Sequence, residues 1–139
     1  MKITVGEVEY EAEFNGWTPI AFSRVFTVTK PDGHTRPKDI TEAVGMIVES
    51  LNAYDIPSIT GLLEVFYACI KTATPKFDVP FSEWVASFPV DAFDMTKGDG
   101  WAADVMGIVG ANFFPQPKPD DVDTAPAKKT RAAAAKQSS

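Results

Sequence analysis

The chain has 139 residues, a formal net charge of −6, a single cysteine and 45% hydrophobic residues. Its length predicts one domain, and its acidity disfavours nucleic-acid binding because phosphate groups repel it. The lone Cys69 cannot form an internal disulfide, and no run of about 18 apolar residues or secretion signal occurs. We therefore expect a protein of a reducing, intracellular setting, with neither a membrane nor a nucleic acid as its partner.

The composition changes sharply after Phe114. Every Phe, Trp and Tyr lies at or before that residue, and the last segment carries five basic against three acidic side chains. Residues 1–114 therefore hold a net charge of −8 and all the large core formers. We predict a globular domain over 1–114 and a disordered tail over 115–139, rich first in Pro and Asp and then in Ala and Lys.

The first residues predict a β-hairpin. Ile3 and Val5 alternate with polar residues, and beyond Gly6-Glu7, a pair suited to a type II′ turn, a second alternating run follows. Its glutamates are expected on a wet face and its apolar residues on a buried one: Glu7, Glu9, Glu11 and Glu13 against Val8, Tyr10, Ala12 and Phe14. An isolated hairpin is only marginally stable. The apolar face must therefore lie on helices or pair with another chain.

A short helix is predicted next, followed by a loop. Thr18 resembles an N-cap and Pro19 the first helical residue, so we place a helix over 19–26. Residues 25–29 also suit a strand, and this alternative stays open. Residues 30–38 are predicted to be a loop, with a turn at Pro31-Asp32-Gly33.

Four further helices complete the predicted fold. Asp39 and Glu42 resemble a capping box, and Pro75 ends the second of these helices. The apolar faces expected are Ile40, Val44, Ile47, Leu51 and Tyr54; then Ile59, Leu62, Leu63, Phe66 and Ile70; then Phe81, Trp84, Val85 and Phe88; and finally Trp101, Val105, Ile108 and Val109. The predicted class is α+β and mostly α, with an N-terminal β-hairpin packed on a bundle of four to five short helices.

No grouping of residues in the sequence predicts catalysis. The only histidine, His34, lies in the predicted turn, and Cys69 lies mid-helix beside no obvious base. The strand glutamates are weighed as a divalent-cation site, but a solvated strand face that discourages edge pairing is the commoner case. We expect no enzyme activity, no metal and no cofactor.

The aromatic residues near the C-terminal end of the domain are the candidate partner-binding residues. Phe81, Trp84 and Phe88 form a stripe, and Phe113 and Phe114 end the last predicted helix. Helical spacing of this kind usually marks core, whereas exposed Trp and Phe favour interfaces. Both interpretations stay open.

Three stretches resemble the tail assembly chaperones of long-tailed bacteriophages. KITVGEVEYEAEF and NGWTPIAFSRVF resemble the family's opening strand pair and first helix, and LLEVFYACIKTATPKFDVPFSEWVASFPVDAFD resembles its aromatic helix, Pro loop and Phe-x-x-Trp helix. The resemblance covers residues 2 to about 114. The Pro-rich segment 30–38 is longer than the family pattern, and the tail has no counterpart.

The resemblance implies a non-enzymatic protein of the host cytoplasm that is absent from the mature virion. Such a chaperone binds the tape-measure protein, keeps it soluble and recruits major tail-tube subunits. A longer frameshifted product would arise near Lys128 and Lys129. The alternatives are a structural tail-completion or head–tail connector protein that stays in the particle, and a small hydrolase using the strand glutamates. We also predict that the chain can self-associate by strand pairing at the edge of the hairpin.

Overall fold

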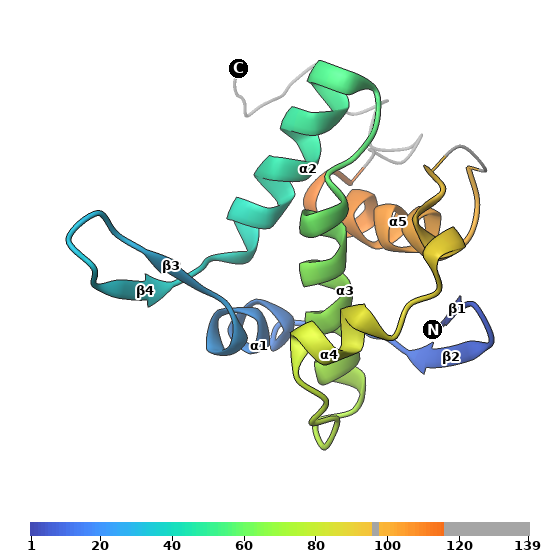
Figure 1. Ribbon diagram of the computed structural model, residues 1–139, viewed down its shortest axis with the longest axis horizontal. Helices are drawn as coiled ribbons and strands as arrows, with labels where there is room; N and C mark the ends of the chain where they lie inside the picture. Colours follow the sequence, from blue (N-terminus) through green and yellow to red (C-terminus); the bar gives the residue numbers. More distant parts are fainter. Residues whose placement is uncertain (96–97, 116–139) are drawn as a thin grey trace, which may run out of the picture. The chain divides into compact units, whose positions relative to one another are not determined.

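The computed structural model describes residues 1–95 and 98–115. The chain divides into two units, Met1–Val109 and Gly110–Ser139, and the predicted tail lies outside the described residues apart from Pro115. The first unit contains two hairpins and a set of helices (Figure 1). The described part of the chain has an N-terminal hairpin and is mainly helical, which confirms the predicted fold class.

Helix α3 (Ile59–Ala73) is the centre of the core. Every residue over 61–70 is buried, so the single apolar face that we predicted is too narrow a description. The helix is covered on several sides because α1 (Thr18–Val25), α2 (Ile40–Tyr54) and the N-terminal hairpin all contact it. Its first turn is capped by Ser58, whose hydroxyl accepts a hydrogen bond from the Gly61 amide. It ends before Thr74-Pro75, because a residue preceding proline disfavours the helical conformation.

The N-terminal hairpin pairs β1 (Lys2–Val5) with β2 (Val8–Glu11). Of the two loop residues only Gly6 has a positive φ, of 61°, as the predicted type II′ turn requires. Ile3 and Val5 are buried, and the Tyr10 ring packs edge-on against Phe66 of α3 at 5.9 Å. The hairpin face therefore lies on helices, as one of our two alternatives stated. Val8 is exposed, so the predicted alternation does not hold along the whole of β2.

Helix α1 starts differently from the prediction. Its N-cap is Trp17, which makes no capping side-chain bond, and Thr18 is the first helical residue. The Thr18 side chain is instead buried, with its hydroxyl 2.9 Å from the hydroxyl of Thr72 on α3. Its hydroxyl also accepts a hydrogen bond from the Asn15 amide. The threonine thus ties the start of α1 to α3 rather than closing the helix end.

A second hairpin occupies most of the segment that we predicted to be a loop. Strand β3 (Thr27–Thr29) pairs antiparallel with β4 (Thr35–Pro37), in a register that places Thr29 opposite Thr35. The predicted turn lies at its tip, where Gly33 has a φ of 89°. The β-branched residues on both sides of this turn favour paired strands over an irregular loop.

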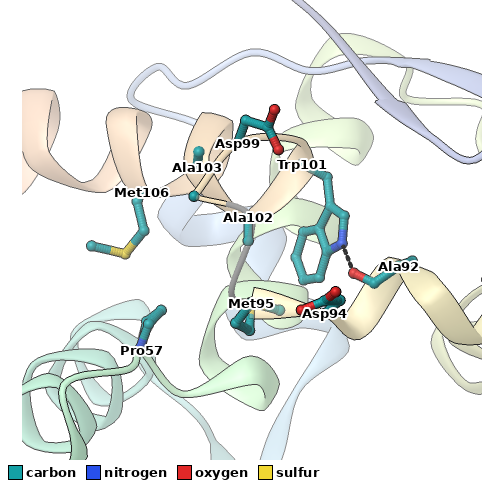
Figure 2. A pocket seen from close by; sticks show the side chains of 10 residues that line it. Pro57, Ala92, Asp94, Met95, Asp99, Trp101, Ala102, Ala103 and Met106 are labelled. Atoms are coloured by element: carbon teal, nitrogen blue, oxygen red, sulfur yellow. Dashed lines mark hydrogen bonds between the residues drawn. The ribbon is translucent and has the colours of Figure 1, made fainter.

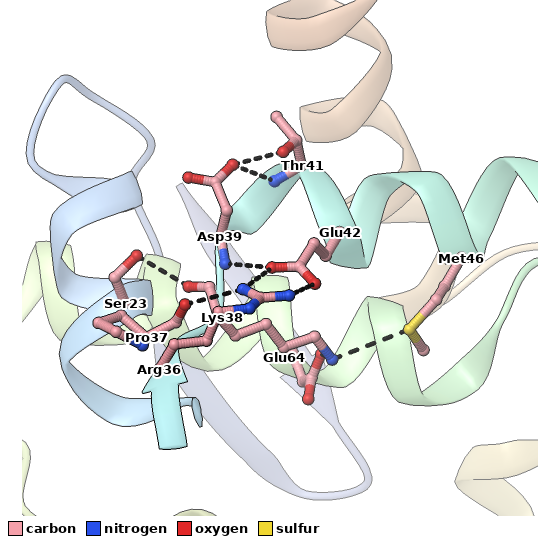
Figure 3. Close-up of polar contacts among 9 residues, drawn as sticks. All are labelled: Ser23, Arg36, Pro37, Lys38, Asp39, Thr41, Glu42, Met46 and Glu64. Atoms are coloured by element: carbon pink, nitrogen blue, oxygen red, sulfur yellow. Dashed lines mark hydrogen bonds and ion pairs between the residues drawn. The ribbon is translucent and has the colours of Figure 1, made fainter. Parts of the chain in front are cut away.

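Helix α2 carries the predicted capping box. The Asp39 side chain accepts a hydrogen bond from the Thr41 amide, and the Glu42 side chain accepts one from the Asp39 amide (Figure 3). The guanidinium of Arg36, in β4, donates two hydrogen bonds to Glu42, each 2.8 Å long. These bonds, with the Asp39 amide, lower the pKa of Glu42 to about 2.

The helix packs through fewer residues than predicted. Ile40, Ala43, Val44 and Ile47 are buried, but Leu51 is half-buried and Tyr54 is 75% exposed. The C-terminal turn of α2 is therefore not covered by the core, and our assignment of Tyr54 to the buried face is wrong.

Lys38, at the entrance to α2, forms a mostly buried ion pair with Glu64 of α3. Lys38 Nζ lies 2.9 Å from Glu64 Oε1, and the two side chains are 14% and 10% exposed. The Lys38 carbonyl also accepts a hydrogen bond from the Ser23 hydroxyl of α1 (Figure 3). One residue at the entrance to α2 thus connects α1 with α3.

The remaining elements of the first unit close the aromatic core. Helix α4 (Phe81–Ala86) and the 3₁₀ helix η1 (Val90–Phe93) lead to α5 (Trp101–Phe113), of which the part up to Val109 belongs to this unit. Trp84 lies at the centre of the cluster, 4.9 Å from the Phe88 ring and 5.2 Å from the Phe66 ring. Edge-to-face pairs of this kind stabilise a core beyond their buried area.

Within the described part of the chain, no helix is both long enough and apolar enough to cross a bilayer.

Candidate docking groove

The predicted aromatic stripe is mainly core. Trp84 is 1% exposed and Phe88 is 8% exposed, so neither offers a free contact surface. Phe88 also lies beyond the end of α4 rather than on it. Phe81 is half-buried, with its ring 4.9 Å from that of Phe26. Of the two interpretations of this stripe, the structure therefore supports the core for Trp84 and Phe88.

The other predicted site residues lie outside the first unit. Phe113 and Phe114 belong to the second unit, in which Phe114 is 50% exposed. A partner-binding role for these two stays a prediction. The predicted frameshift point at Lys128 and Lys129 lies outside the described residues.

The reactive side chains do not gather into a site. Cys69 is buried in α3, and this burial raises the pKa of its thiol to about 12. His34 lies in the exposed turn, where its Nδ1 is 3.1 Å from an Asp32 carboxylate oxygen. Among the residues that the structure describes, no three His, Cys, Asp or Glu side chains come together as a metal site. The strand glutamates are therefore not part of a group of three or more such side chains.

An open, mainly apolar hollow lies beside the first turns of α5, and we call it the α5 groove (Figure 2). It has a volume of about 170 Å³. Most of its lining is apolar, and the acidic residues are Asp94 and Asp99. The lining residues are Pro57, Ala92, Asp94, Met95, Gly98, Asp99, Trp101, Ala102, Ala103 and Met106.

Trp101 holds the wall of the groove in place. Its indole Nε1 donates a 2.7 Å hydrogen bond to the Ala92 carbonyl at the end of η1, as Figure 2 shows. The Trp101 ring stacks on Phe66 of α3, with the ring planes 16° apart and the centroids 5.8 Å apart. Gly98 and Gly100, both with positive φ, turn the chain into α5. The wall formed by Trp101 is therefore anchored in the core, whereas Pro57, Asp94, Met95, Gly98 and Asp99 line the groove from connecting segments.

Two further hollows extend the acidic character of the α5 groove, one directly beside it and the other beside that hollow. The first shares Ala92, Asp94, Asp99 and Trp101 with it and also includes Asp91; the second shares Asp91 with the first and reaches Glu7 in the N-terminal hairpin turn. The described residues that line the three hollows include these four carboxylates and no Lys or Arg.

The size and lining of the α5 groove indicate what it can bind. Pockets for drug-sized ligands usually enclose about 300–1,000 Å³ and converge several polar groups on the ligand. This groove is smaller and mainly apolar, so it suits a few side chains presented by another polypeptide. Methionine is suited to such contacts because its unbranched side chain adapts to irregular partners.

Sequence reasoning missed most of this groove. Pro57, Met95 and Met106 come from three separate segments, and none of them was singled out. The only local signal was the Lys97-Gly98-Asp99-Gly100 break before α5. No family model, curated protein or solved structure matches this chain.

Proposed function

We propose that this protein is a non-catalytic assembly chaperone of a bacteriophage tail. In this role it binds the tape-measure protein, keeps it soluble and recruits tail-tube subunits during assembly. The observation that carries the proposal is the α5 groove, an apolar hollow with Asp94 and Asp99 at its edge and no His, Cys, Ser or Lys among its described lining residues.

The groove has the properties that a chaperone for an apolar helical client needs. Such a protein must offer apolar surface of its own, and it must carry enough net charge to stay soluble. The Met-lined groove supplies the first, and the net charge of −8 over residues 1–114 supplies the second. A hydrophobic groove is a common way to hold the apolar face of a helix.

The resemblance supports the same role and identifies the client. Its longest stretch ends in VDAFD, which includes η1 and supplies Ala92 and Asp94 of the groove. The client implied is a long, hydrophobic and coiled-coil-prone protein. The role places the chain in the host cytoplasm and outside the finished particle.

The decisive experiment is co-expression with the tape-measure protein of the same phage genome. We expect the tape-measure protein to be soluble and to co-purify with this chain, and to be insoluble when expressed alone. A Met106→Asp variant should lose this effect because a charge enters the apolar groove. The matched control is Tyr54→Asp, which places the same charge at an exposed position of α2 that does not line the groove.

Failure of the wild-type chain to change the solubility of the tape-measure protein would contradict the proposal. Mass spectrometry of purified virions tests the alternative function. A chaperone should be absent from them, whereas stoichiometric recovery would identify a structural tail-completion or connector protein.

A further inference from the structure

We infer that the α5 groove binds a helical segment that presents apolar side chains with lysine or arginine next to them. This inference rests on the proposed function and specifies the chemistry of the client. It follows from the contrast between the apolar lining of the groove and the charge around it.

The apolar part of the client is set by the size of the groove. Met95 lines it from the segment after η1 and Met106 from α5, and Ala102 contributes a small side chain from α5 (Figure 2). A volume of about 170 Å³ accommodates a few side chains rather than a whole ligand. On a helix, residues at i, i+3 and i+4 supply such a set from one face.

The basic part of the client is set by charge complementarity. Asp99 lines the groove, Asp91 lines the hollow beside it, and Glu7 lines a third hollow that shares Asp91 with the second. No Lys or Arg occurs among the described lining residues, and Lys97 lies outside the described part of the chain. Opposite charges at the rim of an interface raise the association rate and exclude partners of the same sign.

Other occupants fit these observations less well. Nucleic acid is repelled by the same carboxylates. A second copy of this domain would bring its own charge of −8 to an already acidic surface. A basic amphipathic helix is the partner whose apolar area and charge both match.

The test uses three fluorescently labelled helical peptides and the full chain. The peptides share one Leu/Ala face, and the positions beside that face carry Lys in the first peptide, Gln in the second and Glu in the third. Anisotropy titrations should give the order Lys, Gln, Glu from tightest to weakest binding. The preference for Lys should shrink as salt rises from about 50 to about 500 mM, because salt screens exposed charges. Equal affinities for the Lys and Glu peptides would overturn the inference.

Variants locate the site. Asp91→Asn/Asp99→Asn removes one charge from the groove and one from the hollow beside it, and it should weaken binding of the Lys peptide by about tenfold at low salt. The control Glu49→Gln/Glu83→Gln removes the same charge at exposed positions that do not line these hollows, and it should weaken binding by less than about twofold. Equal losses in the two variants would show a general attraction to an acidic protein and would refute the groove as the site.

A further variant separates the apolar contribution from the charge. Met95→Ser/Met106→Ser should weaken all three peptides about equally, because it removes apolar contact and leaves the carboxylates in place. Unchanged affinity of this variant would also contradict the inference.

The peptide and tape-measure experiments fail independently. If the tape-measure protein is solubilised but the peptides show no charge preference, the proposed function stands and this inference is wrong. If the Lys peptide binds in the groove but the tape-measure protein is not solubilised, the chemistry of the client is right and its proposed identity is wrong.

Discussion

Replacing Gly61 by alanine tests the close approach of α2 and α3. A Cβ atom at Gly61 would lie 2.8 Å from the carbonyl oxygen of Ala43 and 2.9 Å from Cγ1 of Ile47. Because the nearest atom belongs to the backbone, the clash cannot be relieved by a side-chain rotation alone. The two helices would have to separate.

The magnitude follows from two opposing effects. Overpacking a well-packed contact typically costs about 1–3 kcal/mol, and alanine recovers at most about 1 kcal/mol through its higher helix propensity. Because the 2.8 Å contact is to a backbone atom, the overpacking cost should lie in the upper part of this range. We therefore expect Gly61→Ala to lower the free energy of unfolding by about 1–2 kcal/mol. Urea denaturation followed by circular dichroism measures this loss, provided that the slope of the transition stays unchanged.

Gly45 provides a matched control within α2. It is exposed, and no atom lies within 4 Å of a Cβ built on it. Gly45→Ala should therefore raise the free energy of unfolding by about 0.5–1 kcal/mol, because alanine is the better helix former. The reasoning is refuted if Gly61→Ala is as stable as the wild type, or if both substitutions change stability in the same direction.

Three more predictions concern buried and titrating groups. Lys38→Met should lower the free energy of unfolding by about 2–4 kcal/mol, because it leaves the Glu64 carboxylate without its partner. The Lys38→Met/Glu64→Met double variant should lose less than the sum of the two single variants. Additive losses in urea denaturation would contradict this. The pKa of Glu42 is about 2 in the folded protein and 4.5 ordinarily, so its stabilising effect is complete above pH 4.5 and disappears as pH falls toward 2. The difference in the free energy of unfolding between wild type and Glu42→Gln should therefore narrow as the pH falls from 4.5 toward 2. A difference that stays constant over this pH range would refute the prediction. Cys69 should resist thiol reagents at pH 8 until the protein unfolds, because burial raises its pKa to about 12; rapid labelling of the folded protein would show that α3 opens locally.

Features that depend on neighbouring residues could be predicted from the sequence. The Gly6 turn, the Asp39–Glu42 capping box and the end of α3 before Pro75 all appear where we expected them. The physical reason is that a turn or cap is decided by φ preferences and hydrogen bonds among residues only a few positions apart.

Burial and the groove were decided only by the tertiary structure. Tyr54 fits the apolar period of α2 but is exposed. Thr18 is polar but fully buried, and its hydroxyl is hydrogen-bonded there to the hydroxyl of Thr72 on α3. The groove depends on Pro57 and Met106, which are far apart in the chain and line one hollow after folding. Helical periodicity shows which residues share a face, but contacts between distant segments determine which faces are covered.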